Sequence, residues 1–492
     1  MNIHGLRSLS LGYLLLPNLL FYHFWFNRAI AWVAIPLLLY LFYTQVRSSR
    51  RTDTEPISLT NILVVAAFAL LITLVSGTSG ICYQTFDYWS HNTKYYDLFR
   101  HNWPLRMQED GPSISYYFGY YVVPSLLAKS WNTISDTIIF TWGYIGFFLG
   151  LMWVYLALNR KLILVFLALT VGDLAHVFKT FFHKFGKSLY IYGDFGIEFW
   201  SNFENLLWVP NQVIPSMILA GMLFYVIKRG LAVEDLFFPI VLTLWWAVFP
   251  ALTMLLLTGV LTIRNIMLSG FRINWVVQFQ KAILPGLLCL PVMLFFSSHN
   301  ELPISGFVWT FRNDYRNSII EFCVNIGTNI TLFLLLGAYF RKTKPGVQNF
   351  LFYVVVMLLF VFPFYRIGKV NDFLFRGAIP YLLLVGMYLY EPFAAGKPLQ
   401  VVLSRVRQSL PFGLLLLLLG VSSVIAVDRI VRAAKVNRIT ANLYPDKVRF
   451  SAIPYDAYPN TYLVLKERWS LREANQYLGK ENSFYELYLA PR

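Results

Sequence analysis

Charged residues are scarce in this 492-residue sequence, because Lys, Arg, Asp and Glu together make up only 13% of it. Soluble domains carry about 25% charged residues, which they need to solvate their surface. Hydrophobic residues instead account for 57% of the chain and aromatic residues for 18%, and the mean hydropathy is +0.55. These values exclude a soluble globular protein and predict an all-α, polytopic membrane protein.

Cysteine is also rare, and its placement excludes a disulfide framework. Of the three cysteines, Cys289 and Cys323 lie in or beside apolar segments and Cys82 stands alone. The formal net charge of +16 would suit a nucleic-acid partner. The Lys and Arg residues, however, fall mainly in short connections between apolar runs, as the positive-inside rule produces. We therefore expect a lipid bilayer and no nucleic acid.

The apolar runs predict roughly thirteen membrane spans. They are expected at about residues 8–26, 29–43, 59–75, 136–158, 162–171, 209–227, two short segments within 237–263, then 282–296, 318–340, 351–364, 378–390 and 411–427. The basic cluster Arg47–Arg51 follows the second span and is expected inside, which places the N-terminus in the cytoplasm. Residues 116–129 are short, aromatic and broken by Pro124, so they predict an interfacial helix rather than a span.

This topology divides the chain into a transmembrane domain, residues 1–427, and an extracytoplasmic tail, residues 428–492, which has no further span and is expected to pack on the outer face. Four outer loops are expected, at residues 77–135, 173–206, 297–317 and 365–376. Polar side chains gather in these loops, so they are where a functional site is expected.

The first outer loop contains the strongest candidates for chemistry. Asp87 and His91 are four residues apart, which would place them on one face of a helix. A carboxylate flanked by rings that exclude water can have its pKa raised, so that Asp87 would serve as a general base, supported by His91 and Asp97. Trp89 and Trp103 are candidate substrate-binding rings. The alternative is a polar collar that anchors the loop among lipid headgroups.

A divalent cation such as Mg²⁺ or Mn²⁺ is a further possibility at this loop. Asp87 and His91 would be its ligands, but the sequence contains no tight ligand motif, so the metal stays unknown.

The second outer loop ends at the start of an apolar span. Glu204 could support the base, and Trp208, Asn211 and Gln212 surround Pro210, where a helix would begin and present free backbone donors to an anion or sugar. The alternative is a plain helix start with an interfacial tryptophan.

The loop at 365–376 is unexpectedly basic for an outer membrane edge. Arg366, Lys369 and Arg376 predict a binding site for a lipid-linked phosphate, with Asn371 and Asp372 as substrate-binding neighbours. Headgroup binding without chemistry is the alternative.

These loops follow one another in an order that resembles the GT-C superfamily of membrane glycosyltransferases. The stretches DYWSHNTKYYDL, YYFGYYVVP, LLWVPNQVIPS and VNDFLFRGAIP are similar to a bacterial polytopic family within or near that superfamily, and the resemblance covers most of residues 59–393. It implies inverting transfer of a sugar from a polyprenyl-phosphate donor to a glycan, lipid or protein acceptor outside the bacterial inner membrane. Asp87 would be the base, and Arg376 with Arg366 would hold the phosphate.

One position departs from that pattern. Many members carry a second acid directly after the first, where this chain has Tyr88. Metal dependence therefore stays open, and Asp97 or a second-loop acid becomes the possible partner of Asp87.

Two other classes of function remain as alternatives. A transporter or flippase of a lipid-linked saccharide would need ionisable residues in mid-span, and few are present. A non-catalytic scaffold for envelope assembly would tolerate substitution of single carboxylates.

Overall fold

The structure, a computed structural model of the whole chain, describes residues 1–52, 54–107, 111–178, 197–311, 315–368, 371–396 and 398–491. Within these residues, nine helices are long and apolar enough to cross a membrane. They are Arg28–Arg50, Asp136–Ala157, Pro210–Arg229, Val248–Leu268, Trp275–Phe296, Ile319–Thr343, Gly346–Phe364, Asp372–Phe393 and Leu410–Lys435. An all-α polytopic membrane protein is thus confirmed at this level.

The expected count of about thirteen spans stays a prediction, because several of the expected spans are short. Helix α3 has 17 residues, α7 has eight and α11 has seven. At 1.5 Å per residue, α7 and α11 reach only about 10–12 Å, less than half of a hydrocarbon core.

The helices of the first half of the chain are α1 (Ile3–Trp25), α2 (Arg28–Thr52), α3 (Leu59–Val75), α4 (Tyr88–Arg100), α5 (Gly119–Ser130), α6 (Asp136–Ala157), α7 (Leu162–Leu169), α9 (Asn202–Trp208), α10 (Pro210–Arg229), α11 (Phe237–Thr243) and α12 (Val248–Leu268). Those of the second half are α13 (Trp275–Gln278), α14 (Leu284–Phe296), α15 (Tyr315–Asn325), α16 (Thr331–Phe340), α17 (Gly346–Val361), α18 (Asp372–Gly377), α19 (Ile379–Tyr390), α20 (Pro398–Gln408), α21 (Leu410–Lys435), α22 (Arg438–Leu443), α23 (Thr461–Arg468) and α24 (Leu471–Asn475). The strands β1 (Ser305–Phe307) and β2 (Tyr365–Ile367) form one antiparallel pair, with Gly306 opposite Arg366.

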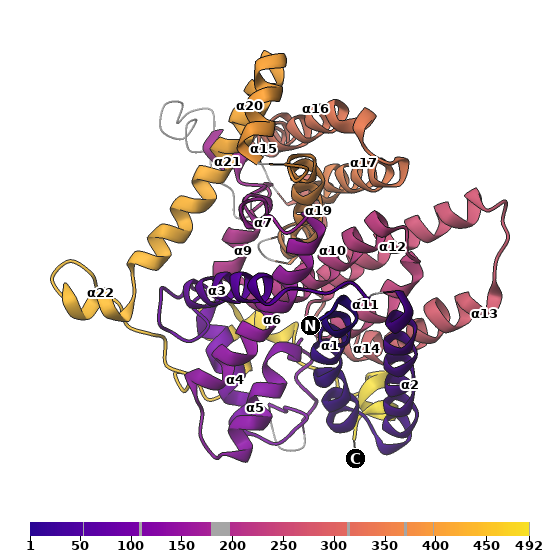
Figure 1. Cartoon of the computed structure of the whole chain (residues 1–492). Coiled ribbons are helices and arrows are strands. Elements are labelled where there is room, and N and C mark those ends of the chain that lie inside the picture. The colour runs from indigo at the N-terminus through magenta and orange to yellow at the C-terminus, as the bar shows by residue number, and fades with distance from the viewer. Residues whose placement is uncertain are drawn as a thin grey trace.

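Helix α10 is the centre of the bundle and packs against α6 and α19 (Figure 1). Its residues 210–227 are all buried. Small residues allow α6 to approach closely: a Cβ on Gly221 would lie 2.6 Å from Cβ of Trp153, and one on Gly150 would lie 2.8 Å from Cβ of Met217. Close backbone approach through glycine is the usual way in which membrane helices pack.

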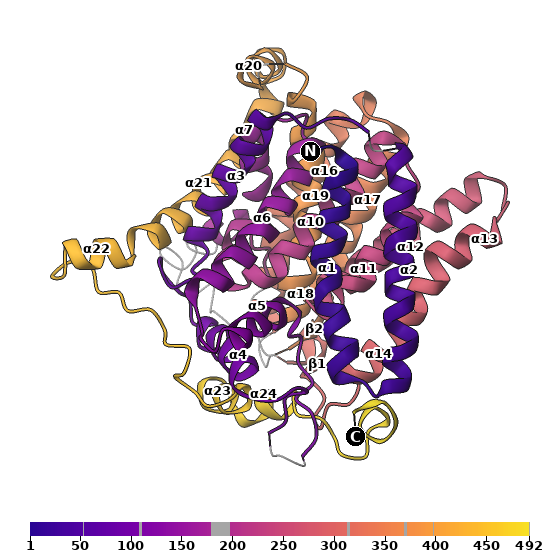
Figure 2. The same ribbon diagram turned by 60° about the horizontal axis from the view of Figure 1, so that its bottom comes forward.

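The end of the bundle that carries the C-terminus is capped by α4, α5, the β1–β2 pair and the tail helices α23 and α24 (Figure 2). The tail is tied to several earlier segments. The backbone N–H of Ser115 donates to the carbonyl of Tyr477 at 2.7 Å, and that of Lys480 donates to the carbonyl of Ser298 at 2.6 Å. The tail therefore lies on the same end as the helix that begins after Asp87.

Candidate functional site

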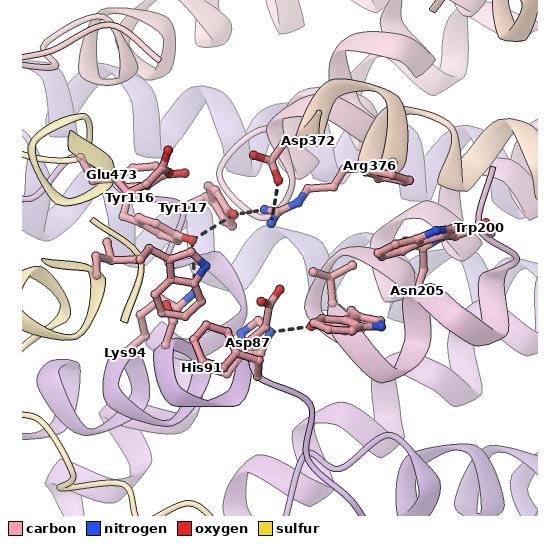
Figure 3. Close-up of a pocket in the computed structure, with 18 residues that line it drawn as sticks. Asp87, His91, Lys94, Tyr116, Tyr117, Trp200, Asn205, Asp372, Arg376 and Glu473 are labelled. Carbon is pink, nitrogen blue, oxygen red and sulfur yellow. Dashed lines mark hydrogen bonds and ion pairs between the residues drawn. The ribbon is translucent and has the colours of Figure 1, made fainter. Parts of the chain in front are cut away.

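A cavity of about 270 Å³ lies where α4, α9, α18 and the tail meet (Figure 3). Five of the residues expected to act from the sequence line it. They are Asp87, His91, Trp208, Asp372 and Arg376. Asp87 and His91 belong to the first expected outer loop, Trp208 follows the second, and Asp372 and Arg376 belong to the fourth, so the fold brings three distant segments together at one site.

Asp87 is the residue directly before α4, and its carboxylate is partly exposed to the cavity. No hydrogen bond or ion pair to this carboxylate is formed by the residues that the structure describes. Burial raises the pKa of Asp87 to about 6, against the lowering effect of Arg376, while Asp372 raises it further and Lys94 lowers it. A carboxylate with this pKa can take up a proton near neutral pH, as a general base must.

Two cations face the same cavity and are joined by a chain of tyrosine hydroxyls. Arg376 Nη2 lies 2.9 Å from Oδ1 of Asp372, and its Nη1 donates to the Tyr117 hydroxyl. The Tyr116 hydroxyl donates to that of Tyr117 at 3.0 Å and accepts from Lys94 Nζ at 3.3 Å.

The positive charge of Lys94 is less well neutralised by nearby carboxylates than that of Arg376. The Lys94 side chain is only 1% exposed, its Nζ lies 4.4 Å from the ring centroid of Tyr116, and no described carboxylate lies within ion-pair distance. Burial lowers the pKa of Lys94 to about 7, and Arg376 lowers it as well, while Asp87 raises it. An ammonium buried with one hydrogen bond is costly, and an anionic ligand in the cavity would relieve that cost.

His91 is held by protein groups on both sides of its ring. Its Nε2 lies 2.8 Å from the carbonyl oxygen of Trp208, which can only accept, so Nε2 carries the proton and Nδ1 accepts from the Tyr121 hydroxyl. Burial lowers the pKa of His91, with Lys94 adding to the effect, which agrees with a neutral ring. His91 therefore ties α4 to α5 and to the end of α9, and metal binding would require it to give up one of these bonds.

No group of three or more His, Cys, Asp or Glu side chains suited to a metal ion occurs among the described residues. Within that part of the chain, no such group of side chains is available to bind the Mg²⁺ or Mn²⁺ that the sequence left open.

Glu204 does not line the cavity, but it binds the indole of Trp208, which does. Its Oε1 accepts from the Trp208 indole N–H at 3.0 Å, and its Oε2 lies 2.6 Å from Arg429 Nη1. Trp200, the second indole in the cavity wall, similarly donates to Glu198 at 3.2 Å. The acids of this loop orient the rings that line the cavity.

Several other expected site residues lie outside the cavity lining. Asp97 accepts from the backbone N–H and the hydroxyl of Thr461, both at 2.7 Å, so it anchors the tail. Trp89 packs under Arg468, 3.8 Å from its guanidinium, and Trp103 packs on Trp25.

The remaining described residues that were expected to act at the second and fourth loops do not line the cavity either. Asn211 and Gln212 are buried in the first turn of α10. Arg366 donates through Nε to the carbonyl of Gly368 at 2.9 Å. Asn371 is fully buried, with φ of 61°, directly before α18. Lys369 lies outside the described residues.

Sequence reasoning missed much of the cavity wall. Lys94 could have been found, because positions 87, 91 and 94 follow the i, i+4, i+7 spacing of one helix face. The residues contributed by the tail, Leu465, Trp469, Glu473 and Tyr477, could not be placed in this way, since they lie more than 350 positions from Asp87.

No protein-family model, curated protein or solved structure matches the chain.

Proposed function

We propose that this protein is a membrane glycosyltransferase that moves a sugar, with inversion, from a polyprenyl-phosphate donor to a hydroxyl-bearing acceptor outside the bacterial inner membrane. The observation that carries the proposal is the Asp87 carboxylate, which has no partner among the described residues and shares a cavity with Arg376. A base and a cation at one site are what displacement of a phosphate by a hydroxyl requires.

The side chains that line the cavity can account for the proton transfer and for the charge on the leaving group. Asp87 takes the proton of the acceptor hydroxyl as its oxygen forms the bond to the anomeric carbon. The bond from that carbon to the phosphate oxygen breaks, and its electron pair leaves with the phosphate. Arg376 stabilises the charge that develops there, together with Lys94, so no general acid is needed for the leaving group.

The size of the cavity also fits this reaction. Pockets of about 300–1,000 Å³ hold drug-sized ligands. A cavity of about 270 Å³ suits one sugar phosphate, so the polyprenyl chain would remain in the lipid.

The test is lipid analysis of membranes from cells that express the wild type, Asp87→Asn or Asp456→Asn at matched levels. Asp456 is an exposed tail carboxylate outside the cavity, so its variant is the control. We expect polyprenyl-phosphate sugar to accumulate with Asp87→Asn alone.

Equal lipid profiles in the three strains would remove Asp87 from the mechanism. Movement of an intact lipid-linked saccharide across the bilayer by the wild type would favour a transporter, and full tolerance of Asp87→Asn in envelope assembly would favour a scaffold.

A further inference from the structure

One wall of the cavity is built entirely by the tail. Leu465, Trp469, Glu473 and Tyr477 line the cavity at a regular spacing of four residues. Leu465 belongs to α23 and Trp469 directly follows it, whereas Glu473 belongs to α24 and Tyr477 follows that helix, so two helices packed against each other form this wall.

The tail wall, as we call these four residues, is fixed at both ends. Asp97 of α4 holds the start of α23 through two bonds of 2.7 Å to Thr461. The carbonyl of Tyr477 accepts from the backbone of Ser115 at 2.7 Å. A wall anchored in this way is a preformed surface for a ligand, with little ordering cost on binding.

The chemistry of the tail wall differs from that of Lys94 and Arg376, the two cations that face the same cavity. Trp469 is partly exposed and packs edge-on against Phe86, with 4.9 Å between ring centroids. Glu473 lies across the cavity from Trp200 (Figure 3). A carboxylate repels phosphate but accepts hydrogen bonds from hydroxyl groups, and an indole offers a flat apolar surface.

We propose that the tail wall is a saccharide subsite, in which Trp469 packs on the apolar face of a neutral sugar ring and Glu473 accepts bonds from its hydroxyls. The subsite rests on the proposed function only in taking this cavity as the place of reaction. The ring can belong to the donor or to the acceptor, because the same chemistry recognises both.

The binding test uses the full-length protein in detergent and saturation-transfer NMR with maltohexaose, laminarihexaose and chitohexaose. We expect ring-proton signals from at least one of these probes with the wild type. The signal should fall about tenfold in Trp469→Ala, as expected when one anchoring aromatic is removed, fall in Glu473→Gln, and be partly kept in Trp469→Phe.

Leu471→Ala is the matched control, because Leu471 is in the same segment and 53% exposed. Its signal should equal that of the wild type. Absence of signal from all three probes, or equal signals in Trp469→Ala and the wild type, would overturn the subsite.

A kinetic test identifies the source of the sugar ring. It uses citronellyl-phosphoryl hexoses as donors and octyl glycosides as acceptors. A raised acceptor KM in Trp469→Ala would assign the tail wall to the acceptor, and a raised donor KM would assign it to the donor; unchanged values of both would contradict it. Saccharide binding that depends on Trp469, without any transfer by the wild type, would keep the subsite and refute the transferase.

Discussion

Asp87 and Lys94 have opposite charges and pKa values displaced toward each other, to about 6 and about 7. Burial is the main cause for both groups, because it disfavours the charged form of each. Pairs of titratable groups whose surroundings bring their pKa values close to the working pH are typical of sites that move protons.

This pair predicts the pH dependence of transfer. Asp87 must be ionised to act as the base, so kcat/KM for the donor should rise as the pH increases through about 6. Lys94 must be charged to bind phosphate, so kcat/KM should fall above about 7. A bell-shaped profile between pH 5 and 9 is therefore expected, and Lys94→Met should remove its alkaline limb. A flat profile would contradict the assignment of both groups.

The same shift predicts that Asp87→Asn is more stable than the wild type at neutral pH. Because the folded pKa is raised from 3.8 to about 6, the folded state holds its proton more tightly than the unfolded state. The wild type therefore loses stability as the pH rises from about 4 to 6. Asn avoids this loss, with a gain on the order of 1–3 kcal/mol above pH 6 and little below pH 4.

Thermal unfolding in detergent at pH 4 and pH 7.5 measures this difference. A lower Tm for Asp87→Asn than for the wild type at pH 7.5 would show that the carboxylate is stabilised by the fold rather than held ready for a ligand.

The sequence identified some of the residues that line the cavity, where their chemistry and their local spacing agreed. Asp87, His91 and Arg376 are examples, since each is a polar group at an expected membrane edge. Arg366 shows why the rest could not be predicted: it belongs to the same basic loop as Arg376, but β-pairing with Gly306 gives it different surroundings. The sequence shows that these two cations are close along the chain. The direction of each side chain, however, depends on contacts with residues elsewhere in the chain.

At the scale of elements, one arginine of α21 contacts both α9 and the segment that follows α7. Arg429 Nη1 lies 2.6 Å from Glu204 and 4.0 Å from Asp173, whose side chain is fully buried. Burial raises the pKa of Asp173 to about 7, while Arg429 lowers it. Arg429 therefore joins α21 to Asp173 and to Glu204, whose other carboxylate oxygen accepts from the Trp208 indole.

Arg429→Leu is expected to destabilise the protein by about 3–5 kcal/mol, the usual effect of removing one partner of a buried ion pair. The loss should be larger at pH 8 than at pH 5.5, because Asp173 is protonated at the lower pH and needs no compensating charge. Arg432→Leu is the control: its partner Asp428 is exposed, and such pairs contribute about 0–1 kcal/mol. Equal Tm shifts for the two variants would contradict this role of Arg429.

The element boundaries show the limits of hydropathy. A long apolar run such as α21 is recognised because it is long, and the aromatic segment at 116–129 forms the short helix α5. Helices α7 and α11 are as apolar as spans but stop after about two turns. Hydropathy records that such a segment avoids water; it does not say whether lipid or protein covers it.

At the scale of the whole molecule, opposite ends of the bundle carry different chemistry. Helices α4, α23 and α24, which contribute to the cavity wall, lie with the C-terminus at one end of the bundle, and the N-terminus lies at the other (Figure 2). Near the N-terminal end, Arg160 lies 2.5 Å from Glu55, and Lys228 and Lys344 share Glu391 at 3.2 and 3.1 Å. Basic residues at this end are typical of a cytoplasmic face, so we propose that the cavity lies on the outer face.

Single-cysteine labelling tests this orientation in a background of Cys82→Ala, Cys289→Ala and Cys323→Ala. Asp446→Cys in the tail should react with a membrane-impermeant maleimide in intact spheroplasts, whereas Lys342→Cys, between α16 and α17, should react only after permeabilisation; both positions are exposed. Labelling after denaturation controls for expression of each variant. The reverse pattern would place Asp87 and Arg376 in the cytoplasm, where nucleotide sugars are the available donors. The polyprenyl-phosphate proposal would then fall, even if the cavity proved to be a transferase site.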